Sequence, residues 1–155
     1  MIPKLKVCFI LAMTLGSHAI AGSPGDDAAA RKPVNAFYAA FNQGFVGPAD
    51  FATEDWTHIN PYGGWTRGRE SALKEVRDVY QAFLKDVTET VGEMDVRFAS
   101  PDVAVVTVVS TTSQFMTPDG VKHERERHIR TFVVVKRGER WLVMQDQNTT
   151  VSPLQ

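Results

Sequence analysis

The chain has 155 residues, of which 43% are hydrophobic and 23% are charged, and these values are ordinary for a globular domain. This length predicts one domain that is long enough to bury a core. The formal net charge is −1 and no basic stripe runs through the sequence, so a nucleic-acid-binding protein is not expected.

The N-terminal segment has the pattern of a secretory signal peptide. Lys4 and Lys6 precede the apolar run 7–13, and the small residues of Ala19-Ile20-Ala21 follow it. We expect cleavage after Ala21, a periplasmic or secreted mature protein, and no membrane attachment after cleavage. The single cysteine, Cys8, would leave with this segment, so neither disulfide nor thiol chemistry is expected. A buried N-terminal helix is the alternative interpretation.

Two helices are predicted from apolar side chains at helical spacing. The first spans 28–43, with Pro33 placed best near its first turn and Gly44 as a C-cap. The second spans 69–84 and has one apolar face opposite a charged face. Between them, residues 48–52 are compatible with a short helix.

Strands are predicted for 56–60, for 87–99, and for three consecutive antiparallel segments within 102–150. Turn residues at 117–120 and 136–139 separate those three segments. Helices followed by a bent antiparallel sheet indicate an α+β fold in which the sheet wraps around a helix layer. Such a sheet forms a cone, and its open mouth is the natural ligand site.

This order of elements resembles the NTF2-like superfamily. Two stretches are similar to its SnoaL-like branch, and more specifically to the DUF4440 (SgcJ/EcaC-type) group: Trp141-x-Val143-x-x-x-Gln147-Asn148-Thr149, and His58-Ile59-Asn60-Pro61 followed by Gly68. The resemblance covers residues 28–150. It implies a strongly curved, cone-shaped sheet, a small-molecule pocket, and a homodimer formed through the exposed face of the sheet. The expected divisions of the chain are a signal peptide (1–21), a linker (22–27), the NTF2-like domain (28–150) and a C-terminal tail (151–155).

Ketosteroid isomerases of that superfamily use a carboxylate base before a Pro-x-Gly turn, together with a tyrosine and a protonated aspartic acid. The matching positions in this chain hold Asn60, Phe37 (beside Tyr38) and Arg130. An asparagine amide does not take a proton from carbon under ordinary conditions. Steroid isomerase activity is therefore not expected.

Side-chain alternation along the strands predicts which polar groups share a pocket. If Phe132 and Val134 point into the cone, Arg130, His128 and Glu126 share their face. The alternating charges of residues 124–127 also fit a solvated or subunit-facing strand. On the last strand, one face is expected to carry Trp141, Val143, Gln145, Gln147 and Thr149. The predicted catalytic residues are His58, His128 and Arg130. The predicted ligand-binding residues are Phe37, Tyr38, Phe41, Trp56, Asn60, Trp65, Gln145, Gln147 and Thr149.

These polar residues also have structural interpretations. Each histidine is either a general base or a hydrogen-bonded strand residue. Arg130 either clamps an anionic ligand or pairs with an acidic residue to hold the sheet together. The histidine spacing is not that of a metal site and no H-E-x-x-H motif occurs, so no metal is predicted, and no cofactor.

The predicted function is therefore a secreted domain that binds a small, largely apolar molecule with a polar or acidic group. Two alternatives stay open from the sequence. One is a cofactor-free isomerase, cyclase or dehydratase with a histidine base. The other is a non-catalytic dimeric interaction module whose cone is filled by its own side chains.

Overall fold

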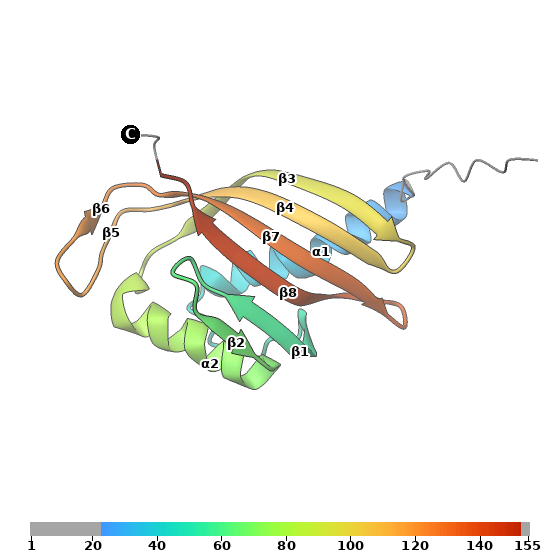
Figure 1. Ribbon diagram of the computed structural model, residues 1–155, viewed down its shortest axis with the longest axis horizontal. Helices are drawn as coiled ribbons and strands as arrows, with labels where there is room; N and C mark the ends of the chain where they lie inside the picture. Colours follow the sequence, from blue (N-terminus) through green and yellow to red (C-terminus); the bar gives the residue numbers. More distant parts are fainter. Residues whose placement is uncertain (1–22, 153–155) are drawn as a thin grey trace, which may run out of the picture.

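The computed structural model describes residues 23–152 and shows a curved sheet that wraps around helix α1, with helix α2 beside the open end of the sheet (Figure 1). The helices are α1 (Pro24–Phe41), α2 (Arg69–Val79) and a π-helical turn, η1 (Tyr80–Leu84). The strands are β1 (Ala52–Ile59), β2 (Trp65–Arg67), β3 (Glu89–Ser100), β4 (Val103–Thr112), β5 (Phe115–Met116), β6 (Lys122–His123), β7 (Arg127–Arg137) and β8 (Arg140–Thr150).

The main sheet has six strands in the order β2-β1-β8-β7-β4-β3. The three predicted C-terminal strands are present as β4, β7 and β8, and the predicted α+β class is confirmed. All neighbours are antiparallel except β1 and β8, which run parallel. Strands β5 and β6 form a separate small hairpin between β4 and β7. The parallel pairing is the feature that local sequence patterns did not predict, because it joins segments about ninety residues apart.

Helix α1 begins at Pro24, four residues before its predicted start, so most of the expected linker is helical. The Ser23 side chain caps the helix by accepting a hydrogen bond from the backbone N–H of Asp26 at 3.2 Å. Pro24 occupies the first helical turn, where its missing N–H costs nothing. Pro33 lies inside the helix instead of at its start.

The segment before β1 also differs from its prediction. Residues 48–52 contain a turn instead of a helix, closed by a hydrogen bond from the Ala52 N–H to the Ala49 carbonyl at 2.9 Å, and β1 begins at Ala52. The second predicted helix, 69–84, is present as α2 followed by η1.

The core lies between α1 and the concave face of the sheet. Phe37 of α1 is its centre, with edge-to-face contacts to Phe45, Phe51 and Phe132 at ring-centroid distances of 5.3–5.7 Å. Val34, one turn earlier, is completely buried. Each such side chain contributes roughly 1.5–3 kcal/mol when it leaves water. The aromatic cluster fills only part of the cone, and the rest of the concave face is left for polar side chains.

A β-bulge in β8 decides which of its side chains face the cone. Val143 pairs with Val134, whereas the next paired residue, Gln145, pairs with Val133. Met144 is therefore the extra residue, and it reverses the alternation of every side chain after it.

The predicted common face of β8 is consequently wrong beyond Val143. Asp146 and Asn148 point into the cone and are 0% and 6% exposed. Gln147 and Thr149 are exposed on the opposite face, and Gln145 is half-buried there.

The predicted signal peptide lies outside the described residues and stays a prediction. Within residues 23–152, no helix is both long and apolar enough to cross a membrane.

Helix α1 ends at Phe41 with Asn42 as its C-cap, and the predicted C-cap Gly44 lies in the turn that follows. Gly44 tests how tightly this turn packs. Its φ is +71°, and a Cβ at this position would lie 2.7 Å from the Tyr80 ring. We expect Gly44→Ala to lower the free energy of unfolding by about 2 kcal/mol or more, because it combines backbone strain with overpacking. Urea denaturation measures this change. Gly47→Ala is the matched control, since nothing lies within 4 Å of its Cβ; equal losses in both variants would contradict the prediction.

Candidate functional site

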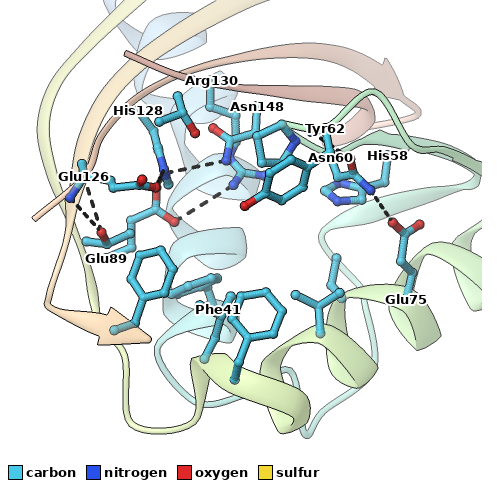
Figure 2. Close-up of a pocket in the computed structure, with 18 of the residues that line it drawn as sticks. Phe41, His58, Asn60, Tyr62, Glu75, Glu89, Glu126, His128, Arg130 and Asn148 are labelled. Atoms are coloured by element: carbon cyan, nitrogen blue, oxygen red, sulfur yellow. Dashed lines mark hydrogen bonds and ion pairs between the residues drawn. The ribbon is translucent and has the colours of Figure 1, made fainter. Parts of the chain in front are cut away.

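A cavity of about 210 Å³ lies at the open end of the cone. Apolar side chains of α1, α2 and η1 form its floor, among them Phe41, Val76 and Phe83. Polar side chains of the sheet form its walls. Figure 2 shows Glu89, Glu126 and His128 on one side and His58, Asn60 and Glu75 on the other, with Arg130 and Asn148 above.

Asp146 is the buried centre of the polar wall, although it does not line the cavity itself. Its Oδ1 accepts a hydrogen bond from the Trp56 indole N–H at 2.9 Å, and its Oδ2 accepts one from Arg130 Nη1 at 2.7 Å. His58 Nδ1 lies 3.0 Å from both carboxylate oxygens. The two residues are direct partners in the parallel β1–β8 register, so the backbone itself brings them together.

The contact with Asp146 orients His58. A carboxylate only accepts hydrogen bonds, so Nδ1 carries the hydrogen and the other ring nitrogen, Nε2, is the one available in the neutral ring. Among residues 23–152, no group hydrogen-bonds to Nε2. His58 is 6% exposed and lines the cavity. The arrangement presents one imidazole nitrogen to whatever occupies the cavity.

Arg130 is engaged within the protein. Besides Asp146, it has Glu89 as a partner, with 3.9 Å between Nη2 and Oε2, and its guanidinium stacks over the Phe37 ring at 4.7 Å. The side chain is 6% exposed. Of the two interpretations from the sequence, the geometry matches an internal ion pair that holds the sheet.

His128 lies between two carboxylates on the other side of the cavity. Its Nδ1 is 3.4 Å from Glu89 and its Nε2 is 3.3 Å from Glu126. Ser110 donates a hydrogen bond to the same Glu89 at 2.5 Å. With both ring nitrogens next to protein acceptors, His128 is less available to a ligand than His58.

The buried charges perturb one another. Burial alone raises the pKa of the Asp146 carboxyl, but His58, Arg130 and the Trp56 N–H together hold that pKa below its usual range. Burial likewise raises the pKa of Glu89, and His128, Arg130 and Ser110 outweigh it, so that this pKa is also lowered. Burial raises the pKa of the Tyr38 hydroxyl to about 12.

The structure brings six of the predicted site residues to the cavity: His58, His128, Arg130, Phe37, Phe41 and Asn60. The other six do not line it. Tyr38 is buried in the core, and Trp56 lies behind the wall, where it holds Asp146. Trp65 is 58% exposed and stacks against Arg67, because β2 is an edge strand. Gln145, Gln147 and Thr149 face away from the cone because of the bulge.

Three acidic residues of the site were not predicted from the sequence: Asp146, Glu75 and Glu89. Strand alternation placed Glu126 on the face of His128, but it was not selected as a site residue. One signal was available for Asp146, since aspartate is depleted in strands and this one stands inside a β-rich segment. Glu75 was hidden on the charged side of a helix. Within residues 23–152, no group of three or more His, Cys, Asp or Glu side chains is placed to hold a metal ion.

Comparison with known proteins identifies the fold. No protein-family model matches the chain, and no curated protein matches it. Among solved structures, an NTF2-like protein of unknown function from Pseudomonas putida KT2440 is 11% identical, with a TM-score of 0.69 over 86% of this chain and 92% of that one. The protein has the NTF2-like fold.

Two further structures share the NTF2-like fold. An uncharacterised protein with a cystatin-like fold from Caulobacter vibrioides is 23% identical, with a TM-score of 0.76 over 82% of this chain and 90% of that one. A hexachlorocyclohexane dehydrochlorinase (LinA type 2) is 13% identical, with a TM-score of 0.71 over 83% of this chain and 86% of that one. At these identities the likeness extends to the fold alone.

Replacing the buried carboxylate tests its structural role. We expect Asp146→Asn to lower the free energy of unfolding at neutral pH by about 3–5 kcal/mol, because it leaves the buried Arg130 without its closest partner. Chemical denaturation measures this loss. The control is Gln147→Ala, one residue further along on the exposed face, which should change stability by less than about 0.5 kcal/mol.

The buried carboxylates of Asp146 and Glu89 make the free energy of unfolding depend on pH. Because the folded-state pKa values of Asp146 and Glu89 are lowered, their stabilisation is complete above the ordinary pKa of about 4 and is lost as pH falls through the lower folded values. We therefore expect the loss of stability below pH ~4 to be shallower in Asp146→Asn than in the wild type. Identical pH dependence in the two proteins would contradict this assignment.

Proposed function

We propose that the protein is a cofactor-free enzyme that binds a small, largely apolar molecule in its cone and removes a proton from carbon with His58 as general base. The observation that carries this proposal is the His58–Asp146 pair, which leaves Nε2 free at the wall of an apolar cavity. A reaction of the elimination or isomerisation type needs such a base and requires no bound metal.

The two residues have separate roles in the proposed step. Nε2 of His58 accepts the proton, and the electrons of the broken C–H bond form a new double bond as a leaving group departs from the neighbouring carbon. Asp146 keeps Nδ1 protonated and stabilises the imidazolium that forms. Asp146 is a positioning residue, since it does not line the cavity.

The fold is compatible with this class of reaction, and the cavity supports it over the interaction-module alternative. One protein with the same fold is a dehydrochlorinase, an enzyme that catalyses an elimination. The interaction-module alternative requires a cone filled by its own side chains, and a cavity of about 210 Å³ argues against it. Steroid isomerisation lacks support, because Asn60 binds Glu75 through its amide and offers no base.

The base can be tested without knowledge of the natural substrate. In 5-nitrobenzisoxazole, removal of the ring C–H proton breaks the N–O bond and releases a coloured phenolate, so absorbance reports proton transfer directly. We expect kcat/KM to fall by about a hundredfold or more in His58→Gln, because positioned general bases contribute 10²–10⁴ in rate.

Gln147→Ala is the control for this assay, since the side chain is exposed on the other face of β8. Its kcat/KM should equal that of the wild type. An unchanged rate in His58→Gln would reject His58 as the base. Saturable binding of the probe without any turnover would instead favour a binding protein.

We further propose that two copies associate through the outer face of the sheet. Two cross-strand apolar pairs lie on that face, Val105 with Val133 and Val109 with Ile129. Ile129 is 37% exposed. Contiguous β-branched side chains on the outer face of a sheet are suited to a symmetric contact.

Light scattering coupled to size-exclusion chromatography tests this association. We expect the wild type to elute with twice the mass of one chain, and Ile129→Lys to shift it to the monomer mass, because a charge within an apolar interface is costly to bury. Val46→Lys changes an exposed apolar residue elsewhere and should leave the mass unchanged. A monomeric wild type would contradict the proposal.

A further inference from the structure

The charges of the cavity wall are strongly unbalanced. Three carboxylates line the cavity, those of Glu75, Glu89 and Glu126, against the single guanidinium of Arg130. Arg130 is already paired with Asp146 behind the wall. The two histidines of the wall balance these charges only when protonated. An anionic ligand would therefore meet an acidic cavity in which none of the described lining residues is an unpaired Lys or Arg.

Glu75 is the carboxylate with the least compensation. It accepts a hydrogen bond from the Asn60 amide at 3.0 Å and another from the Thr66 hydroxyl, and both donors are neutral. Within residues 23–152, no Lys, Arg or His side chain forms an ion pair with it. Glu89, by contrast, has Arg130 and His128 beside it, and Glu126 has two histidines. Glu75 comes from α2 and shares its side of the cavity with His58 (Figure 2).

A second observation points to a ligand that donates hydrogen bonds. Asn148 lines the cavity opposite the aromatic floor and is 6% exposed, yet its side-chain oxygen has no hydrogen-bond partner among the described residues. Buried acceptors of this kind normally find a donor. The amide nitrogen of Asn148 lies 3.5 Å from His128 Nδ1, so its oxygen is the end of the amide that still lacks a donor.

The floor of the cavity suits the same kind of ligand. Phe41, Phe83 and Phe115 line it, and Tyr62 lies at its rim. Aromatic rings bind apolar bodies, and their faces also attract cations. Carboxylates combined with aromatic rings recognise a protonated amine on an apolar skeleton.

We propose that the cavity selects a small amine: a molecule with an aromatic or aliphatic body whose ammonium group is held by the Glu75 carboxylate. This inference rests on the proposed function, because it names the class of molecule that occupies the same cavity. The sequence analysis expected a ligand with a polar or acidic group. The proposal replaces that group with a cationic nitrogen and excludes an acidic ligand. It also places the charged end of the ligand on the His58 side of the cavity.

Three probes of similar size and different charge test the selection: 2-phenylethylammonium, 2-phenylethanol and 3-phenylpropanoate. Isothermal titration at neutral pH and low salt measures the Kd of each for the mature protein. We expect the ammonium compound to bind at least ~tenfold more tightly than the alcohol, because charge-assisted hydrogen bonds are about twice as strong as neutral ones. The carboxylate compound should bind most weakly of the three.

Glu75→Gln tests the residue, since it removes the charge and keeps the shape of the side chain and one of its two acceptor oxygens. We expect the Kd of the ammonium compound to rise about tenfold, with less than a twofold change for the alcohol. Glu70→Gln is the matched control: it lies on the same helix, with 87% of its side chain exposed, outside the cavity. It should leave all three Kd values unchanged.

The possible outcomes separate this inference from the proposed function. Equal binding of ammonium and alcohol, tightest binding of the carboxylate, or an unchanged preference in Glu75→Gln would overturn the amine selection. His58→Gln in the proton-transfer assay would still decide the proposed function. The comparison of probes uses the unaltered protein, so a poorly folded Glu75→Gln variant would not prevent the test. An absence of binding by all three probes would overturn the selection together with the small-molecule cavity.

Discussion

The rest of the structure depends on the buried carboxylate of Asp146. A charge without water around it is expensive, and it persists here because Trp56, His58 and Arg130 all supply polar hydrogens to its two oxygens. These partners come from β1 and β7, the strands on either side of β8. The carboxylate therefore ties three neighbouring strands together at the point where the apolar core gives way to the polar half of the cone.

This division of the cone gives the site its chemical character. Phe37 and the side chains around it exclude water from one half, and the guanidinium of Arg130 lies against that aromatic ring. Electrostatic interactions at such a boundary are stronger than in water, because the surrounding dielectric is low. A chain of charged and polar side chains consequently extends across the sheet: an ion pair joins Glu89 to Arg130, and hydrogen bonds join Arg130 to Asp146 and Asp146 to His58. His58 is the last member of this chain, and its Nε2 lies at the cavity without a hydrogen-bond partner among the described residues.

The extent to which this site could be predicted differs from strand to strand. On β7 simple alternation held, and it correctly placed His128 and Arg130 on the face of Phe132. On β8 the same rule failed after Met144, because one extra residue exchanges the two faces. The rule consequently selected Gln147 and overlooked Asp146, its immediate neighbour. Trp56 was chosen for its size as a pocket wall, whereas its indole N–H is needed behind the wall by Asp146.

The sequence by itself determined the α+β class, the positions of the long elements and the inward face of β7, because periodicity and turn chemistry are local properties. Only the tertiary structure decided the rest. Residues separated by 88 positions meet at the His58–Asp146 contact, and no local pattern records which strands will lie side by side. The charge of the cavity was decided in the same way, since Glu75, Glu89 and Glu126 come from a helix, a strand and a loop. In the sequence, each of these glutamates has the pattern of a surface residue, and only the fold places it at the cavity.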